Sequence, residues 1–177
     1  RSAVGTMRVA KRDDQREKLL EVIEHDVRRL DRLVTDISNA SRLDSELVRE
    51  TAEPFDLVRM SSTLSEHLSR QAWDKGVDFI ADFPGEPIWI EGLEARLAQV
   101  VVNLIANAIH YTDQGHIDVA WRTERHQLVL RVQDTGRGIG AEDQAKIFAE
   151  FYRVDETRAL HDGLGLGLSI VKRLCQL

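Results

Sequence analysis

The sequence predicts an α+β fold, in which helices cover one face of a sheet and an antiparallel helical hairpin precedes them. Apolar residues recur every three or four positions over residues 16–47, β-rich runs alternate with helical segments after Pro54, and glycines cluster where segments end. A chain of 177 residues is long enough for one ordinary domain with a small helical appendage.

Residues 1–53 are expected to form part of the hairpin. Its longer helix, over residues 16–47, has a seam formed by Leu20, Ile23, Val27, Leu30, Val34 and Ile37. A shorter apolar segment at residues 3–10 precedes a polar turn at residues 11–15. So wide an apolar stripe needs a partner, and we therefore expect a homodimer in which two hairpins form a four-helix bundle.

Residues 54–177 are expected to form the second domain, because a proline cannot continue a helix and disfavours helix in the residue before it. Periodicity predicts helices at residues 57–74, 93–111, 141–148 and 165–177, and strands at residues 77–82, 88–90, 116–122 and 127–133. These blocks indicate a mixed or antiparallel sheet that is covered on one face.

The composition is that of a folded protein without a broad charged surface. Apolar residues make up 42% and charged residues 31% of the chain, unlike a disordered segment. The net charge of -6 offers no footprint for nucleic acid. Cys175 is the only cysteine, which excludes an internal disulfide and fits a reducing cytoplasm. The longest apolar stretch, residues 97–109, is too short to cross a bilayer, and no signal peptide is visible.

Two asparagines, Asn103 and Asn107, are four residues apart in the predicted helix at residues 93–111. This spacing places both side chains on one face of the helix. Amide oxygens are hard, uncharged donors that suit Mg²⁺ when phosphates supply the remaining charge. An isolated pair of this kind is also typical of an ordinary solvated helix face, so its meaning depends on the motifs that follow.

A carboxylate and three glycines directly follow the predicted strand at residues 127–133, in the run DTGRGIG at residues 134–140. A buried Asp134 can accept a hydrogen bond from the exocyclic amine of adenine, whereas guanine presents an oxygen there. Glycine removes the Cβ that would block a base and permits positive φ. A glycine-rich turn without any ligand explains the same pattern equally well.

A second glycine cluster, GLGLGLS at residues 163–169, opens the last predicted helix. Free N–H groups and the positive end of the helix dipole favour phosphate at such a position. The spacing fits neither the P-loop nor the dinucleotide-binding motif, and so indicates a third kind of nucleotide fold.

The segment between the two glycine clusters is interpreted as a lid. Phe148 and Phe151 are expected to pack in the core as its base, and a charged stretch up to Asp162 forms its moving part. Arg153 is the expected phosphate contact of this segment.

These four elements occur in one order between residues 103 and 169, and there the chain resembles the catalytic domain of sensor histidine kinases, with its N, G1, F and G2 boxes. The resemblance covers residues 57–177. It implies the ATP-binding Bergerat (GHKL-type) fold, a two-layer α/β sandwich shared with type II topoisomerases, heat-shock protein 90 and mismatch-repair ATPases. Residues 23–47 are similar to the second helix of the family's dimerisation and phosphoacceptor hairpin.

The resemblance implies a role for each position that matches a family motif. Asn107 and Asn103 would bind Mg²⁺, Asp134 would read adenine, and Tyr111 would lie near the base. His110 stands where the family usually has a lysine that helps to hold phosphate, and it is included among the ATP-binding positions. The other implied ATP contacts are Gly136, Gly138, Ile139, Arg153, Gly163, Leu164, Gly165, Leu166 and Gly167.

The function that the resemblance implies is that of an ATP-dependent protein-histidine kinase module of a two-component system. ATP and Mg²⁺ would be its cofactors, and a response-regulator receiver domain would take the phosphoryl group from the histidine onto an aspartate. The chain would be the cytoplasmic portion of an inner-membrane sensor protein.

The family's acceptor histidine lies in a His-Glu/Asp-x-x-x-Pro motif, and no proline follows His25-Asp26 at that spacing. We therefore expect the acceptor upstream of Arg1, so that this chain alone would not label itself. The resemblance also implies further strands beyond Leu177, which would complete the sheet. Two alternatives stay open. One is a non-catalytic dimerising and signalling module, and the other is an ATPase or protein-serine kinase of the same fold.

Overall fold

The computed structural model describes residues 16–20, 22–23, 27, 51–125, 127–154 and 165–176. Residues 16–20 are helical, but most of the predicted hairpin lies outside the described residues, and the hairpin stays a prediction. The elements of the second domain are β1 (Glu53–Asp56), α3 (Leu57–Asp74), β2 (Asp78–Asp82), β3 (Trp89–Gly92), α4 (Glu94–Tyr111), β4 (His116–Glu124), β5 (Gln127–Asp134), α5 (Ala141–Gln144) and α6 (Gly167–Leu174).

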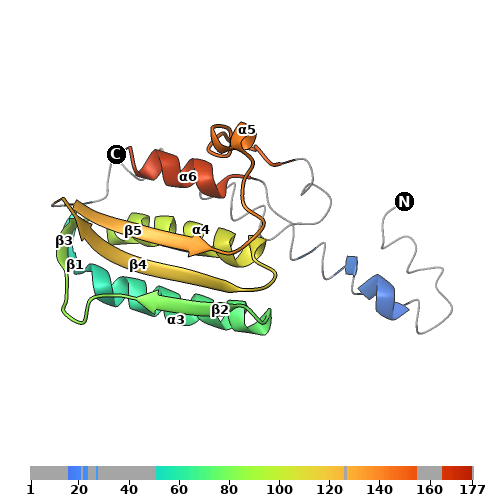
Figure 1. Cartoon of the computed structure of the whole chain (residues 1–177), viewed down its shortest axis with the longest axis horizontal. Coiled ribbons are helices and arrows are strands. Elements are labelled where there is room, and N and C mark those ends of the chain that lie inside the picture. The colour runs from blue at the N-terminus through green and yellow to red at the C-terminus, as the bar shows by residue number, and fades with distance from the viewer. Residues whose placement is uncertain are drawn as a thin grey trace.

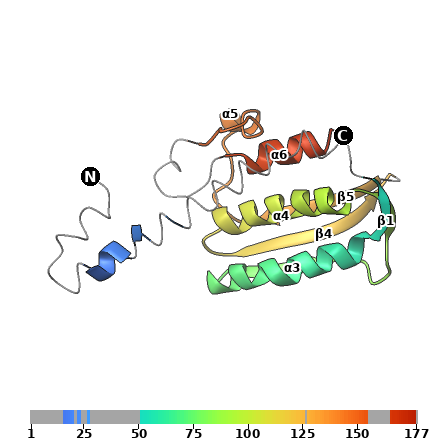
Figure 2. The same cartoon turned by 180° about the vertical axis from the view of Figure 1, so that it is seen from behind.

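The main sheet has three strands in the order β2-β4-β5. β2 runs parallel to β4, with Ile80 opposite Asp118, and β4 runs antiparallel to β5, with Val119 opposite Val132. The helices α3 and α4 lie together on one face of this sheet (Figures 1 and 2). The predicted two-layer arrangement with a mixed sheet is therefore confirmed.

A second, two-stranded sheet pairs β1 with β3, with Pro54 opposite Glu91. The sequence analysis missed β1, because Pro54 was interpreted only as a boundary. A proline is tolerated at an edge strand, since it lacks only the N–H that would point outward. Directly after β1, Asp56 caps α3, because its Oδ1 accepts hydrogen bonds from the backbone N–H groups of Val58 and Arg59 at 3.0 and 3.3 Å.

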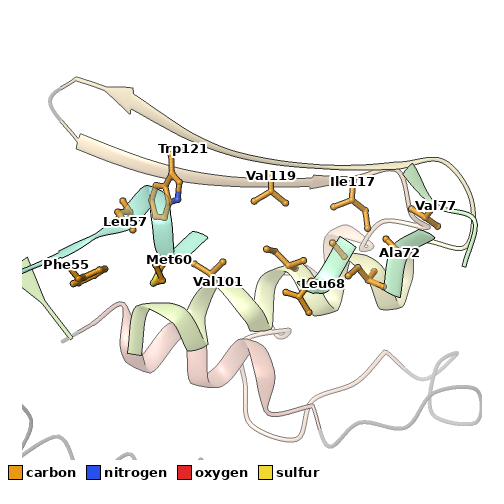
Figure 3. Packing of buried hydrophobic residues seen from close by; sticks show 13 residues of the cluster. Phe55, Leu57, Met60, Leu68, Ala72, Val77, Val101, Ile117, Val119 and Trp121 are labelled. Atoms are coloured by element: carbon orange, nitrogen blue, oxygen red, sulfur yellow. The ribbon is translucent and has the colours of Figure 1, made fainter. Parts of the chain in front are cut away.

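The core lies between the main sheet and the two helices (Figure 3). Val101 and Ile105, which are four residues apart on α4, are completely buried in it. The indole Nε1 of Trp121 on β4 donates to Ser61 Oγ on α3 at 2.8 Å, so that this buried polar pair is satisfied. Because α4 packs through the face of Val101 and Ile105, the face with Asn103 and Asn107 is directed elsewhere.

Two expectations for the segment after β5 are wrong. The helix expected at residues 141–148 ends at Gln144, because the N–H groups of Lys146 and Ala149 bond to carbonyls three residues back, as in turns. The aromatic side chains expected in the core are exposed, with 39% of Phe148 and 61% of Phe151 accessible. None of the helices in the described part of the chain is long and apolar enough to span a membrane.

Candidate functional site

The start of α6 lies against the asparagine pair of α4. A Cβ built on Gly167 would lie 3.7 Å from Oδ1 of Asn103 and 3.9 Å from Nδ2 of Asn107. Among the described residues, the buried Nδ2 of Asn103 has no hydrogen-bond partner. No side chain from this part of the chain caps the start of α6, so no such cap occupies its first N–H groups. Two amides and a helix N-terminus thus face one another, although Asn103 and Gly167 are far apart in the sequence.

This arrangement fits a magnesium ion that accompanies a phosphate. The amide oxygens are donors of the type that Mg²⁺ accepts, and the helix start would hold the phosphate. Among the residues that the structure describes, no group of three or more His, Cys, Asp or Glu side chains is placed to hold a metal ion. The amide pair on α4 stays a predicted metal site, because its oxygens are suitable donors.

The turn after β5 packs against the C-terminal end of α4. A Cβ on Gly136 would lie 2.9 Å from the carbonyl carbon of Tyr111 and closer still to its oxygen. Only glycine allows this approach, since real Cβ atoms do not come so near to backbone. The N–H of Gly136 also donates to Oδ1 of Asp134 at 2.9 Å, which fixes the carboxylate relative to the turn.

Thr135 and Gly115 form a further contact at this place, which the sequence analysis missed. The hydroxyl of Thr135 accepts from the N–H of His116 at 2.9 Å. Gly115, with φ of 107°, lies so close that a Cβ there would collide with the threonine hydroxyl. The loop from α4 to β4 and the turn after β5 are thereby joined.

The ligand-facing side of the turn is open. Asp134 is exposed, which corrects the expectation of a buried carboxylate, and Ile139 is 45% exposed. Gly138 has φ of 70°, and no heavy atom of the described residues lies within 4 Å of the place where its Cβ would be. The carboxylate and the glycine backbone are therefore accessible to an incoming base.

Tyr111 lies between two other side chains of the site. Its ring meets that of His110 edge to face at 4.7 Å between centroids, and the guanidinium of Arg137 lies 4.8 Å from its centroid. A cation at this distance from a ring face is attracted by the ring quadrupole. The aromatic side chain is thus linked to the turn at residues 134–140 through Arg137 as well as through Gly136.

The segment after α5 reaches the start of α6. The phenol of Tyr152 donates to Oδ1 of Asp143 at 2.5 Å, which folds the segment back on α5. Gly165, with φ of 72°, packs so that a Cβ would lie 2.5 Å from the carbonyl oxygen of Tyr152 and 3.1 Å from Cγ of Arg153. Arg153 is thereby near the start of α6, as its expected role in phosphate binding requires.

The remaining predicted positions divide into two groups. Leu166 is buried and packs with Ile170 and Leu174, so its side chain stabilises α6, and its contact with ATP stays a prediction. Gly163 and Leu164 lie outside the described residues, as does the lid segment at residues 155–162.

A separate groove of about 440 Å³ lies between α3 and β2. It is lined in part by Ser65, Trp73 and Phe79, and none of the predicted site residues contributes to it. The candidate site is therefore distinct from this hollow.

Residues 92–177 match the family described as histidine kinase-, DNA gyrase B-, and HSP90-like ATPase. The chain is 39% identical to the sensor protein ChvG of Rhizobium meliloti (strain 1021), over 99% of this chain and 32% of that protein. It is 36% identical to the sensor histidine kinase RppB of Synechocystis sp. (strain ATCC 27184 / PCC 6803 / Kazusa), over 87% of this chain and 34% of that protein.

A solved structure of full-length ShkA in complex with AMPPNP is similar to the chain with a TM-score of 0.73 and 27% identity, over 96% of this chain and 35% of that chain. The fold and the matched family define an ATPase domain of the histidine kinase, gyrase B and HSP90 class. These likenesses support a sensor histidine kinase catalytic domain, as the sequence predicts. It spans about a third of the length of the curated relatives it matches.

Proposed function

We propose that this chain is the nucleotide-binding part of a protein-histidine kinase, and that ATP with Mg²⁺ binds where α4, α6 and the turn after β5 meet. The observation that carries the proposal is the approach of Gly167 to Asn103 and Asn107. It joins a phosphate-binding helix start to a pair of oxygen ligands. The family that residues 92–177 match is one of ATPases.

Each element of the site has a separate role in this proposal. Asp134 accepts a hydrogen bond from the exocyclic amine of adenine, which discriminates against guanine. The base approaches the open backbone at Gly138, with Tyr111 nearby. The first N–H groups of α6 and the side chain of Arg153 hold phosphate oxygens. Asn107 and Asn103 contribute oxygen ligands to Mg²⁺, which neutralises charge on the phosphates.

The reaction requires little covalent chemistry from this chain. A ring nitrogen of the acceptor histidine attacks the γ-phosphorus, and a nitrogen–phosphorus bond forms while the bond to the β,γ-bridging oxygen breaks and ADP leaves. The protein contributes in-line positioning and stabilisation of the charge on the transferred group. The phosphohistidine then passes its phosphoryl group to an aspartate of a response-regulator receiver domain.

The proposal extends to the whole protein. Residues 1–53 would belong to the dimerisation and phosphoacceptor hairpin and residues 54–177 to the catalytic domain. Two copies would associate through a four-helix bundle, as wide apolar hairpin seams require. The protein would act as the cytoplasmic portion of a membrane-anchored sensor.

The test is transfer of label from γ-labelled ATP to an added hairpin that contains a His-Glu/Asp-x-x-x-Pro acceptor. We expect acid-labile, base-stable label on the hairpin, and much less of it when Asp134→Asn replaces the wild-type chain at the same ATP concentration. Acid-stable label would indicate a serine kinase, and phosphate release without label an ATPase. Binding without either would indicate a signalling module. Strong label on the chain alone, lost in His25→Gln, would show that His25 is the acceptor.

A further inference from the structure

Lys75, in the turn between α3 and β2, reaches across to the C-terminal end of α4. Its Nζ donates to the carbonyl oxygens of Ile109 at 2.7 Å, Thr112 at 2.9 Å and His110 at 3.4 Å. The same ammonium lies 3.5 Å from Oδ1 of Asp113. One lysine side chain thus contacts three backbone carbonyls at the end of α4 that are 34 to 37 residues away in the sequence.

These carbonyls are the ones that a helix leaves without partners. The last carbonyl groups of an α-helix have no intrahelical donor, and they form the negative end of its dipole. Many helices end on a glycine in the left-handed conformation, whose N–H groups satisfy them. α4 ends instead on Thr112, which is extended with φ of -107°. The three donors of the Lys75 ammonium supply this cap from another element.

The turn that carries Lys75 is itself fixed. The N–H of Lys75 donates to the carbonyl of Ala72 at 3.0 Å, and that of Gly76 to the carbonyl of Trp73 at 2.9 Å. Gly76 has φ of 75°, which lets the chain reverse into β2. The ammonium is therefore placed by ordered backbone and only a side chain has to be immobilised to form the cap.

The capped helix end also contacts the nucleotide site. Tyr111 lies between the carbonyls of His110 and Thr112 that Lys75 binds, and its own carbonyl presses on Gly136. Gly136 in turn donates to the carboxylate of Asp134. A shift of the helix end by a few tenths of an ångström would therefore move the turn that carries Asp134, because no free space separates the two.

We propose that Lys75 is a positioning residue of the nucleotide site, which holds the end of α4 at the place that the turn after β5 requires. This inference rests on the proposed function of that site. Lys75 acts through Tyr111 and Gly136 and does not touch the nucleotide. A methionine at this position keeps the approximate length of the side chain but removes its charge and its hydrogen-bond donors. An arginine keeps the charge and the donors.

The experiment compares Lys75→Met and Lys75→Arg with Trp121→Phe, which removes the buried hydrogen bond to Ser61. Figure 3 shows Trp121 and Val77 toward different ends of the core, and Val77 follows Lys75 closely in the sequence. The control variant therefore lowers stability at a distance from Lys75. At a temperature where all variants are folded, we expect Lys75→Met to weaken ADP binding about tenfold, because the released end of α4 would let the turn that carries Asp134 move. Lys75→Arg should recover most of the affinity, and Trp121→Phe should change it by less than about twofold.

Hydrogen exchange provides a readout that does not need nucleotide. Lys75→Met should accelerate exchange of the amides at residues 112–116 and 134–138. Trp121→Phe should leave exchange in these two segments as in the wild type when the two variants are compared at conditions of equal unfolding free energy. Unchanged exchange in both segments would overturn the proposal, as would equal loss of ADP affinity in Lys75→Met and Trp121→Phe. A wild-type chain that binds no adenine nucleotide would refute the proposed function alone, since the exchange comparison would still decide the role of Lys75.

Discussion

Gly136→Ala tests how the turn after β5 packs on the end of α4. The new Cβ would lie 2.8 Å from Oδ1 of Asp134 and 2.9 Å from the carbonyl carbon of Tyr111. Ordinary van der Waals contact begins at 3.4 Å, so the helix end and the turn must separate by at least about half an ångström. The Tyr111 carbonyl is backbone, and the separation from it therefore requires backbone movement.

The loss of stability expected for Gly136→Ala comes from this steric overlap alone. Gly136 is not among the glycines with positive φ, so alanine meets no conformational strain there. Overpacking by one methyl group against backbone destabilises a protein by about 1–3 kcal/mol. If the turn moves away from α4, Asp134 moves with it, and we expect ATP affinity to fall by about tenfold or more, which is about 1.4 kcal/mol.

Urea unfolding gives the stability change and titration calorimetry with ATP gives the affinity. Gly85→Ala is the control, because no heavy atom of the described residues lies within 4 Å of its Cβ position and its φ is not positive. It should change stability by no more than about 0.5 kcal/mol and leave affinity unaltered. If Gly136→Ala behaved like Gly85→Ala in both measurements, the close packing of the turn on α4 would be refuted.

Three further variants separate the parts of the site. Gly167→Ala should keep the free energy of unfolding within about 1 kcal/mol of the wild type, because the new Cβ would lie at an ordinary contact distance from Asn103. It should nevertheless lower ATP affinity, because the methyl group would enter the phosphate position. Unchanged affinity in calorimetry would place the phosphates elsewhere. Asp134→Asn keeps an oxygen for the N–H of Gly136 but loses an adenine acceptor, so ATP affinity should fall by about 1.5–3 kcal/mol at constant melting temperature, and equal affinity would remove Asp134 from the site. Asn107→Ala should weaken ATP binding chiefly when Mg²⁺ is present; the same loss in EDTA would indicate a folding defect.

Local periodicity was sufficient for the helices that bury one continuous face. The helix predicted at residues 57–74 has the bounds of α3, and α4 starts one residue later than predicted, at Glu94. Both bury apolar side chains every three or four residues, and this is the signal that periodicity measures. The helix predicted at residues 141–148 lacks such a face, since none of the residues of α5 is buried. Turns follow α5 where the predicted helix would have continued beyond Gln144.

Contacts between distant segments could not be predicted in this way. The bonds from Lys75 to the end of α4 join residues 34 to 37 positions apart, and the bond from His116 to Thr135 spans 19. Neither pair belongs to a repeating pattern, so both depend on the register of β2 and β5 against β4. Residue type predicts burial of Phe148 and Phe151, but both side chains are exposed, because burial depends on which elements pack against them and not on residue type alone.

The central claim is that nucleotide binds where α4, α6 and the turn after β5 meet. Backbone amide chemical-shift mapping during titration with ADP and Mg²⁺ tests it most directly. The largest shifts should occur at Asn107, Gly136 and Gly167, and the shifts at Gly136 should be lost in Asp134→Asn. Shifts confined to the groove between α3 and β2, around Trp73, would show that nucleotide binds elsewhere, because that groove contains none of the residues to which the mechanism assigns a role.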